Sequence, residues 1–347
     1  MKLNIFTKTK ISNDLGIIFN QDETVIYIKN QGIVLKEPTY IAIDEKTKEI
    51  VETGEKAYQM LGKTPPSIKV ICPLKNGVIA DFDMAVALLN EFLKRVYQKT
   101  ILKPRILMSI PSDITAIEKK AFFDCLINIG AREVFFKSSP VLSSIGAGCD
   151  VSLARGMLVC SMDFSRCDAV TVSSSQIISK NSSSASSCMF IEEIIKFLKK
   201  RHGLEVGFIT ASSIHQKMLS SYLTEEVANI TVSGCDTSTG MPKFVTIDSL
   251  GLKEFVFPVF KKISDTIRIA LDNAPIEMQK EIVEDGILLT QNGADICELD
   301  KYLKTELGVK VFFAQNLCDC LIDGIECEIQ RLDEQLGEGT KYYTPEQ

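Results

Sequence analysis

The sequence predicts an α/β protein made of two similar halves with a cleft between them. In each half, strand-like segments rich in β-branched residues come first, and helix-like and strand-like segments alternate afterwards. Each half also carries an aspartate in a turn near its start, at Asp14 and again at Asp163. With 347 residues, of which 45% are hydrophobic, the chain is long enough for two domains with buried cores. A cleft between two such halves is a common place for a ligand.

The elements of the first half are predicted from its hydrophobic patterns. Its strands are short and bounded by turn residues, and they cover Thr24–Ile28, Thr39–Ile43, Arg105–Ile110 and Glu133–Phe136. Its helices have apolar residues at helical spacing, and they cover Met84–Gln98, Ile114–Ile129 and Val141–Gly148. Gly130 follows the second helix, where a C-terminal cap is expected.

The same order of elements restarts after Gly156. The predicted strands are Met157–Met162, Ala169–Ser174, Gly286–Thr290 and Val309–Phe313. The predicted helices are Phe190–Arg201, Thr210–Ser220, Asp295–Leu307 and Asn316–Glu334. This repetition is what predicts a duplicated architecture.

The composition argues against several functional classes. The 11 Cys residues include no C-x-x-C pair, which favours buried thiols in a reducing cytosol over a zinc ribbon. Two His residues leave little for a histidine-based metal site or nucleophile relay. A net charge of -6 without a basic cluster argues against a nucleic-acid partner. No apolar run is long enough to span a bilayer and no signal peptide is evident, so we expect a cytoplasmic protein.

One short stretch, SNDLGIIFNQDET, contains Asp14-Leu15-Gly16 and raises the question of a phosphate-binding turn. An Asp-x-Gly at a hairpin tip can place a carboxylate on Mg²⁺ and leave backbone N–H groups free for phosphate oxygens. A three-residue motif is common by chance, so its assignment as a phosphate-binding turn depends on the rest of the sequence.

Several longer segments resemble the MreB family, the bacterial actin homologues of rod-shaped cells. These segments are IKNQGIVLKEPTYIAI (28–43), GEKAYQMLGKTPPSIKVICPLKNGVIADF (54–82), GAREVFFKSSPVLSSIGAG (130–148), TSTGMPKFVTI (237–247) and APIEMQKEIVEDGILLTQNGADICELDKYLKTELGVKV (274–311). The resemblance runs from Asn13 to about Leu332. It implies the actin-like fold shared with Hsp70 and hexokinase, in which two RNase H-like halves form four subdomains around a nucleotide cleft.

The resemblance also implies how the chain is divided. Residues 1–12 would be an N-terminal tail. Residues 13–150 together with 316–347 would form domain I, with a small subdomain at about 38–72. Residues 151–315 would form domain II, with a small subdomain at about 188–248.

The resemblance places Asp14-Leu15-Gly16 on the strand before the first phosphate turn. The family's Asp-Leu-Gly-Thr-Ala-Asn then falls on Ile18-Phe19-Asn20-Gln21-Asp22-Glu23. Ile18 therefore replaces the magnesium-facing Asp and Asn20 replaces the turn glycine. Asp22 and Glu23 stand where the family has small neutral residues. Loss of the glycine matters because glycine lets the backbone approach a phosphate closely.

The other nucleotide motifs are also changed. The second phosphate turn reads Asp163-Phe164-Ser165-Arg166-Cys167-Asp168, which keeps an Asp as a candidate metal ligand but loses its glycines. Ser139 replaces the Glu that positions the attacking water. Ser212, Ser213 and His215 replace the segment whose Glu and Lys approach the nucleoside, and Asn292, Gly293 and Ala294 lie in the loop near the adenine. Ser179–Cys188 replaces a Gly-Gly-Asp loop, and Ser182–Ser187 is predicted to be a flexible loop.

The N-terminal tail combines apolar Leu3, Ile5 and Phe6 with lysines, and comparable tails in some members of the family bind membrane. Ile101 and Leu102 fall where the family has a second exposed apolar loop. The alternative is a disordered tail with a partly buried turn.

We therefore expect an MreB-like protein of cell-shape maintenance that forms or modulates membrane-associated filaments at the inner face of the cell membrane. Binding and hydrolysis of ATP with Mg²⁺ are expected to be lost or much weakened. Its partners would be itself or an MreB-type paralogue, the membrane surface and cell-wall elongation proteins. One alternative is an active ATPase that uses Asp163 with Asp14, Asp22 or Glu23. Another is a non-polymerising adaptor or cap. We also expect Ile18, Phe19 and Phe164 to meet across the cleft.

Overall fold

The first of two large sheets is built from the N-terminal part of the chain in this computed structural model, which describes residues 14–96, 103–225, 227–291, 296–315 and 319–335. Its strands run in the order β10 (Glu133–Ser138), β9 (Arg105–Ile110), β1 (Asp14–Phe19), β2 (Glu23–Ile28) and β3 (Gly32–Pro38). The central strand β1 pairs antiparallel with β2 and parallel with β9. Asp14, Leu15 and Gly16 therefore lie inside a buried strand and not in a turn.

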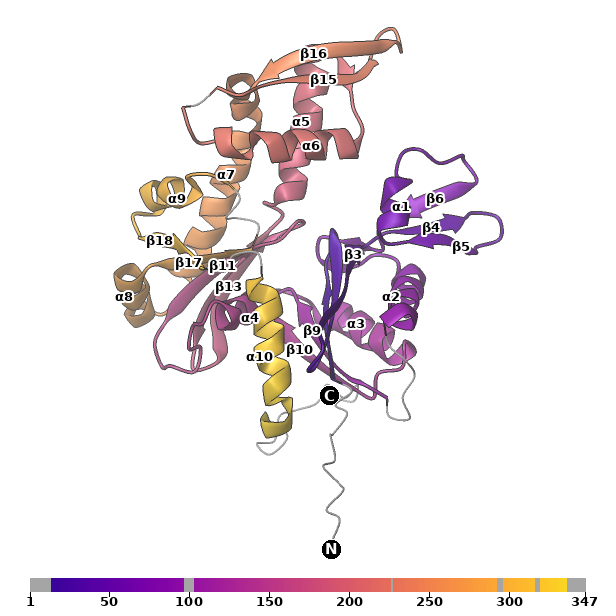
Figure 1. Ribbon diagram of the computed structural model, residues 1–347. Helices are drawn as coiled ribbons and strands as arrows, with labels where there is room; N and C mark the ends of the chain where they lie inside the picture. The colour runs from indigo at the N-terminus through magenta and orange to yellow at the C-terminus, as the bar shows by residue number, and fades with distance from the viewer. Residues whose placement is uncertain (1–13, 97–102, 226, 292–295, 316–318, 336–347) are drawn as a thin grey trace, which may run out of the picture.

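Helices cover both faces of this sheet. Successive side chains of a strand point to opposite faces, so Leu15, Ile17 and Phe19 pack in one core and Ile18 in another. The first core is covered by α2 (Phe82–Val96) and α3 (Ala116–Asn128). The second is covered by α4 (Ser139–Gly146) and α10 (Cys320–Gln335). Figure 1 shows α2 and α3 on the far side of the sheet from α10.

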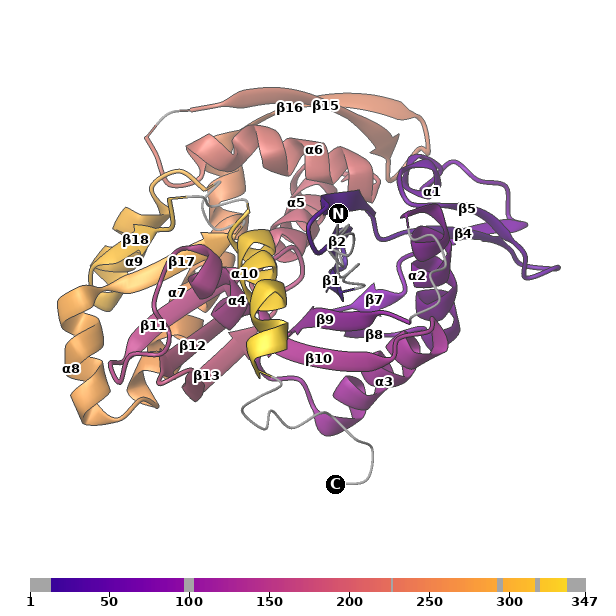
Figure 2. The same cartoon turned by 60° about the horizontal axis from the view of Figure 1, so that its bottom comes forward.

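The second sheet repeats this plan. Its strands run in the order β13 (Gln176–Ser183), β12 (Cys167–Ser173), β11 (Met157–Met162), β17 (Ile287–Gln291) and β18 (Val311–Phe313). One face packs on α5 (Ser187–His202), α7 (Ser249–Asp272), α8 (Ile276–Asp285) and α9 (Leu299–Leu307). The other face packs on Val141 and Ile145 of α4 and on Cys320 of α10. These two helices therefore lie between the two sheets (Figure 2).

The α4 and α10 helices cross with their backbones in close contact. A Cβ atom added at Gly324 would overlap the carbonyl group of Leu142, and one added at Gly146 would overlap that of Cys320. Lys137 at the end of β10 donates to the buried carboxylate of Glu328 on α10 at 2.5 Å. The crossing is thus fixed by glycine packing and by one buried ion pair.

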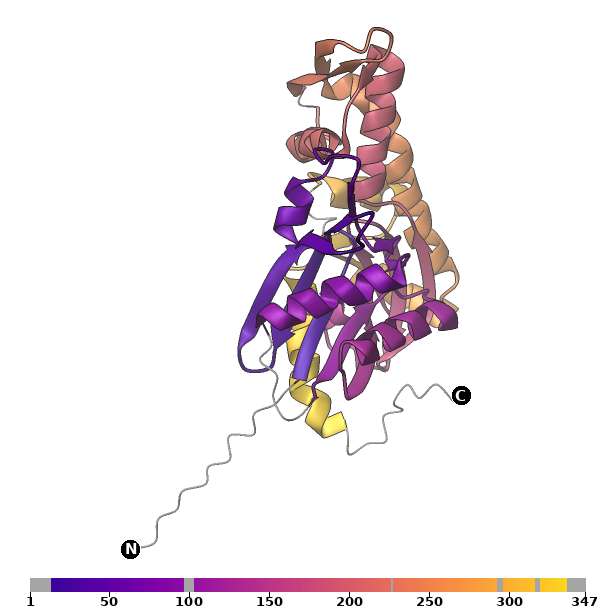
Figure 3. The same cartoon turned by 90° about the vertical axis from the view of Figure 1, so that its right-hand side faces the viewer.

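Each half carries a smaller β-containing part at the same end of the molecule (Figures 1 and 3). In the first half it contains β4 (Ile41–Asp44), β5 (Ile50–Thr53), α1 (Glu55–Gln59) and β6 (Ile68–Ile71). A short hairpin of β7 (Leu74–Lys75) and β8 (Val78–Ile79) follows it. In the second half it contains β14 (Leu204–Glu205), α6 (Phe208–Met218), the 3₁₀ turn η1 (Leu219–Ser221), β15 (Asn229–Asp236) and β16 (Pro242–Asp248).

The serine-rich segment is the clearest error of the sequence prediction. Ser182 and Ser183 belong to β13, and Ser186 caps α5, so Ser182–Ser187 is not a flexible loop. The hydroxyls have partners that hold them in regular structure. Ser182 Oγ lies 3.2 Å from Ser112 Oγ, and Ser183 Oγ accepts from Thr266 Oγ1 at 2.7 Å.

Other predictions are off at the element ends. The helix predicted over Asp295–Leu307 begins at Leu299, and the helix predicted from Asn316 is described from Cys320. The strand predicted to begin at Thr39 begins at Ile41. No helix in the described part of the chain is long and apolar enough to cross a membrane.

Candidate functional site

Two hairpin turns, one from each sheet, form the centre of the candidate site. The first turn joins β1 to β2, where Phe19 pairs with Thr24 and Asn20 N donates to Glu23 O at 3.0 Å. The second turn joins β11 to β12, where Met162 pairs with Cys167 and Asp163 N donates to Arg166 O at 2.9 Å. The two turns have the same register and can be matched residue by residue.

That register changes the meaning of Asp163. Asp163 matches Asn20 at the first position of the turn, and the residue that matches Ile18 on the strand is Ser161. Ile18 and Ser161 therefore occupy the same strand position in the two hairpins, and neither carries a carboxylate. Asp163 is a turn residue whose carboxylate is bonded within its own turn.

The backbone N–H groups of the second turn are hydrogen-bonded by a carboxylate of the same turn. Asp163 Oδ1 accepts hydrogen bonds from the backbone N–H of Ser165 and of Arg166, each at 2.7 Å, and from Ser165 Oγ at 3.2 Å. Successive backbone N–H groups in a turn are the usual cradle for a phosphate oxygen. Here the cradle already holds an anion that belongs to the chain.

Arg166 joins the two halves of the molecule. Its Nε donates to Asp168 Oδ1 in its own half at 2.8 Å. Its Nη1 donates to Asn76 O in the other half at 3.1 Å, and its Nη2 donates to Asp113, also in the other half. The Arg166 side chain is only 10% exposed. We call Arg166, Asp168, Asn76 and Asp113 the clasp.

Further hydrogen bonds between the halves surround the clasp. The Ser112 N–H donates to Asp168 Oδ2 at 3.0 Å, and Lys180 Nζ donates to Ser112 O at 2.8 Å. The Ser112–Ser182 hydroxyl pair lies beside them. The roles of Asn76, Ser112, Asp113 and Lys180 were not predictable from the sequence, because only the fold brings these distant residues together.

The first turn is anchored within its own half. Gln21 O accepts from Cys72 Sγ at 3.3 Å, and Gln21 Oε1 accepts from Asn76 N at 3.1 Å. Glu23 lies 3.3 Å from Lys36 Nζ on the neighbouring strand. Asn20 closes the turn through its backbone.

Asp22 is the exception in the first turn, because its Oδ1 is buried and has no hydrogen-bond partner among the residues that the structure describes. Burial, and then the negative charge of Asp163, raise its pKa to about 7. Burial and Asp168 likewise raise the pKa of Asp163 to about 6. Such raised values mean that this region disfavours negative charge.

The predicted contact of Ile18, Phe19 and Phe164 is wrong. Ile18 packs toward α4 and α10, whereas Phe19 packs on the opposite face of the sheet, because neighbouring strand residues alternate. Phe164 packs against the core of the second half and makes an edge contact with Phe208 at 6.1 Å between ring centroids. At the turns, the two halves meet through the polar clasp instead.

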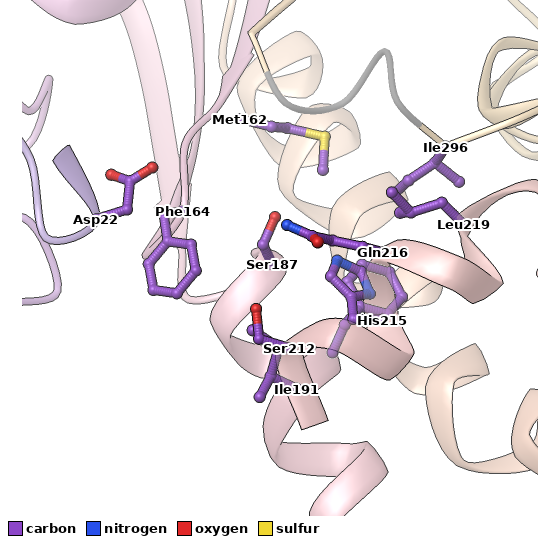
Figure 4. Close-up of a pocket in the computed structure, with 11 residues that line it drawn as sticks. Asp22, Met162, Phe164, Ser187, Ile191, Ser212, His215, Gln216, Leu219 and Ile296 are labelled. Carbon is purple, nitrogen blue, oxygen red and sulfur yellow. The ribbon is translucent and has the colours of Figure 1, made fainter. Parts of the chain in front are cut away.

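A cavity of about 200 Å³ opens beside the two turns (Figure 4). Both polar and apolar side chains form its walls, and it is lined by Asp22, Met162, Phe164, Ser187, Phe190, Ile191, Ser212, His215, Gln216, Leu219 and Ile296. All of these except Asp22 come from the second half. Figure 4 shows Ser187 and Gln216 close together in the middle of the cavity.

Two of the three residues predicted near the nucleoside reach this cavity. Ser212 and His215 on α6 line it, whereas Ser213 is exposed and does not. His215 Nδ1 lies 3.0 Å from the Tyr222 hydroxyl, and its ring stacks on Phe190. Burial lowers the pKa of His215 to about 4, so it is neutral at pH 7. Gln216, one turn after Ser212, was missed although its helical spacing could have revealed it.

The remaining predicted residues lie elsewhere. Ser139 begins α4 and donates its hydroxyl to Ile110 O at 3.1 Å, so it is bound within its own half. Cys167 is buried next to Cys160, and this contact together with burial raises the pKa of its thiol. Several predicted residues lie outside the described part of the chain: Leu3, Ile5, Phe6, Ile101, Leu102, Asn292, Gly293 and Ala294.

The residues present do not fit a magnesium nucleotide. The N–H cradle is filled by Asp163, Arg166 is bound by two carboxylates, and the nearby acids have raised pKa values. Within the described residues, no group of three or more His, Cys, Asp or Glu could hold a metal ion. We therefore derive no reaction step through ATP or Mg²⁺.

Comparison with known proteins gives a consistent picture. The family model for MreB/Mbl proteins matches residues 8–336. The cell shape-determining protein MreB of Escherichia coli K12 is 33% identical over 333 residues, which are 94% of this chain and 96% of that protein. The cell shape-determining protein Mbl of Bacillus subtilis 168 is 30% identical over 324 residues, 93% of this chain and 97% of that protein.

Solved structures agree with these relatives. MreB5 of Spiroplasma citri bound to AMPPNP superposes with a TM-score of 0.88 at 26% identity, covering 94% of this chain and 99% of that one. The MamK double helical filament superposes with a TM-score of 0.74 at 16% identity, covering 94% and 99%, and this likeness concerns the fold alone. The prediction of an actin-like fold is confirmed.

Proposed function

The chain belongs to the MreB/Mbl family, and from this we propose that it is an actin-like cell-shape protein whose cleft is closed by its own side chains instead of by a nucleotide. In this proposal the protein assembles with copies of itself or with a related chain that still uses ATP. It works as a structural component, and hydrolysis of ATP is not part of its cycle.

The observation that carries the proposal is the hydrogen bonding of Asp163. Its carboxylate accepts two backbone N–H groups of the second turn at 2.7 Å, where a phosphate oxygen would otherwise bind. A phosphate would have to displace a carboxylate that is covalently held in place. Hydrogen bonds to a charged group are worth about 1.5–3 kcal/mol each, so this displacement is costly.

The clasp supports the second part of the proposal. A nucleotide can hold two halves of a protein together only if it binds the closed state more tightly than the open one. Arg166 and Asp168 make such contacts across the halves without a ligand, through Asn76 O, Asp113 and the Ser112 N–H. Arg166 would lose these partners when the halves separate.

Fewer observations support the alternative of an active ATPase, because two of its candidate acids are already bonded to other groups. Asp14, one of its candidate acids, is buried and accepts from Arg105 Nε at 2.7 Å and from Arg105 Nη2 at 2.6 Å. Lys29 Nζ lies 3.7 Å from the same carboxylate. Asp163 is occupied by its own turn. A remodelled ATPase site would therefore depend on Asp22 and Glu23.

The experiment compares the protein with and without Mg·ATP. A nucleotide present at 100 times its dissociation constant would stabilise the fold by about 2.7 kcal/mol. We expect millimolar Mg·ATP to leave the melting temperature unchanged and filament pelleting to be equal with ATP, ADP or neither. A rise of several degrees, or filaments that form only with ATP, would refute the proposal.

The same assay tests the clasp with Arg166→Gln. We expect this variant to pellet less in every nucleotide condition, because the cleft opens. Arg155→Gln is the matched control, since Arg155 makes a similar pair with Asp285, at 2.5 Å, within one half. Electron microscopy that finds no filaments of the unmodified chain, alone or with an ATP-using relative, would favour the adaptor alternative.

A further inference from the structure

We propose that closure of the cleft takes up one proton on Asp22, so that the closed form of the protein is favoured as the pH falls. Asp22 belongs to the first half and faces the second half across the cleft. This inference goes beyond the proposed function, because it concerns the equilibrium between the closed and the open form and not a ligand of the cleft.

Asp22 lies where the two halves meet. It lines the cavity beside the two turns, and the other described residues that line this cavity belong to the second half. In Figure 4, Asp22 lies on the opposite side of the cavity from Ser212 and His215 of α6. The residue is partly exposed, but its Oδ1 atom is buried and has no hydrogen-bond partner in the part of the chain that the structure describes. Separation of the halves would return this oxygen to water.

The charges that act on the Asp22 carboxyl are negative. Asp163 of the second turn and Glu23 of the first turn both disfavour its ionised form. Arg166, the cation of the second turn, is already bound by two carboxylates of the clasp. Burial of a carboxyl group without a donor or a cation favours its protonated form.

The other titratable groups that face Asp22 are neutral at pH 7. His215 lies on the far wall of the cavity, and burial lowers its pKa to about 4. Tyr40 and Cys72 belong to the first half, and the charge of Asp22 acts on both. Burial raises the pKa values of these two groups, so neither is ionised. None of the three can supply a positive charge to Asp22.

Closure and opening give Asp22 different affinities for a proton. Burial and the charge of Asp163 raise its pKa to about 7, whereas the backbone N–H groups of Asp22 and Glu23 lower it. These N–H groups belong to the first turn and stay beside the carboxyl when the halves separate. Burial and the approach of Asp163 exist only in the closed form. The pKa of Asp22 is therefore higher in the closed form than in the open form.

The closed form is consequently favoured most at low pH. Its advantage falls as the pH rises from about 4, near the ordinary pKa of an aspartate, to about 7, and then levels off. One proton bound with these two pKa values lowers the ratio of closed to open molecules about tenfold between pH 6 and pH 8.

Hydrogen exchange of the Ser112 N–H tests this dependence. This N–H donates to Asp168 Oδ2 in the other half at 3.0 Å, so it exchanges when the halves separate. The full chain is measured at pH 6, 7 and 8 by mass spectrometry that resolves single residues, and each rate is divided by the rate of an unstructured chain at the same pH. We expect the corrected rate to rise about tenfold from pH 6 to pH 8.

The amide of Leu107 is the reference for unfolding of the whole protein. Leu107 lies on β9, which is paired on both sides, with Gly16 of β1 and with Phe135 of β10. Its amide should exchange more slowly than that of Ser112 at every pH, because the first sheet stays intact when the cleft opens.

Three variants identify the group that titrates. The side chains introduced by Asp22→Asn and Asp22→Ser cannot ionise, and in both variants the corrected rate should be equal at pH 6 and pH 8. The use of two different neutral side chains separates loss of the charge from any new hydrogen bond of the amide. Glu23→Gln is the matched control, because it removes a neighbouring acid on the same turn and keeps Asp22, so it should keep most of the rise.

Three results would overturn the inference. The first is a corrected Ser112 rate that is equal at pH 6 and pH 8 in the unmodified protein. The second is a rise that persists in both Asp22 variants, which would assign the proton to another group. The third is exchange of Ser112 at the rate of Leu107, which would mean that the halves separate only on unfolding. None of these results involves a nucleotide, so the proposed function would stand and fails only on its own test with Mg·ATP.

Discussion

Asp22 combines a buried oxygen, which has no hydrogen-bond partner in the described part of the chain, with a pKa of about 7, against an ordinary value of 3.8. The folded protein therefore holds this proton more tightly than the unfolded chain does between those two pH values. The contribution of Asp22 to stability therefore falls as the pH rises from about 4 to about 7 and then levels off, because above pH 7 the folded state carries an unfavourable buried charge.

This dependence of stability on pH gives a prediction for the variant Asp22→Asn, whose side chain cannot ionise. We expect the variant to be more stable than the unmodified protein at pH 8 by at least about 1 kcal/mol, and equal to it near pH 4. Thermal melts of both proteins across this pH range measure the difference. A gap that stays the same at every pH would show that ionisation of Asp22 is not its cause.

The residues of the two turns show what sequence could and could not predict at this scale. Replacement of an expected acid by Ile18 is visible in the sequence, because the flanking segments fix its position. Asp163 was expected in the second turn and lies there, but only the pairing of Met162 with Cys167 shows that it matches Asn20 and not Ile18. The clasp was not predictable, because Asn76 and Asp113 approach Arg166 only through the fold.

Among the secondary-structure elements, α4 and α10 are the helices that pack against both sheets. Leu142 packs on the first sheet, and Val141 and Ile145 pack on the second. The helices can approach closely only because Gly146 and Gly324 have no side chain. A movement of one sheet relative to the other would change the packing of these two helices.

We therefore predict that Gly324→Ala destabilises the protein by about 1–3 kcal/mol, as expected when a methyl group is forced into close packing. Urea unfolding followed by circular dichroism measures the loss. Gly207→Ala is the control, because a Cβ at Gly207 meets nothing within 4 Å and its φ of -79° suits alanine. Equal stability of the two variants would mean that the helices can separate at little cost.

Elements with a strong hydrophobic pattern were predicted well. Met157–Met162 and Arg105–Ile110 match β11 and β9 at both ends, because buried strands are continuous apolar runs. Short strands with exposed residues, such as β5 and β16, gave no clear pattern. The long helix α7 was not predicted from periodicity, and it contains Pro258 in its interior, which is unfavourable in a helix.

For the whole molecule, a position at the inner face of the cell membrane remains a prediction. It rests on Leu3, Ile5 and Phe6 with their neighbouring lysines, and on Ile101 and Leu102, all outside the described residues. Each buried apolar side chain contributes about 1.5–3 kcal/mol, so one tail binds weakly and an assembly binds firmly.

Co-sedimentation with anionic liposomes tests this prediction. Pelleting should fall with Phe6→Glu and with rising salt, because the lysines contribute a screened attraction. Phe244→Glu is a control, since Phe244 is an exposed phenylalanine on β16, far along the chain from the tail. If a variant that lacks residues 1–12 pellets as well as the full chain, the tail does not bind the membrane.

The carboxylate in the second turn also determines how the protein would respond to the metabolic state of the cell. Stabilisation by a dissociable ligand rises and falls with the concentration of that ligand. Asp163 is part of the chain, so its local concentration at the turn is constant, and it can be neither hydrolysed nor exchanged. Under the proposed function, a polymer of such subunits would contain no nucleotide whose hydrolysis could time its disassembly. It would persist through energy starvation, and its disassembly would have to come from dilution, from proteolysis or from another protein.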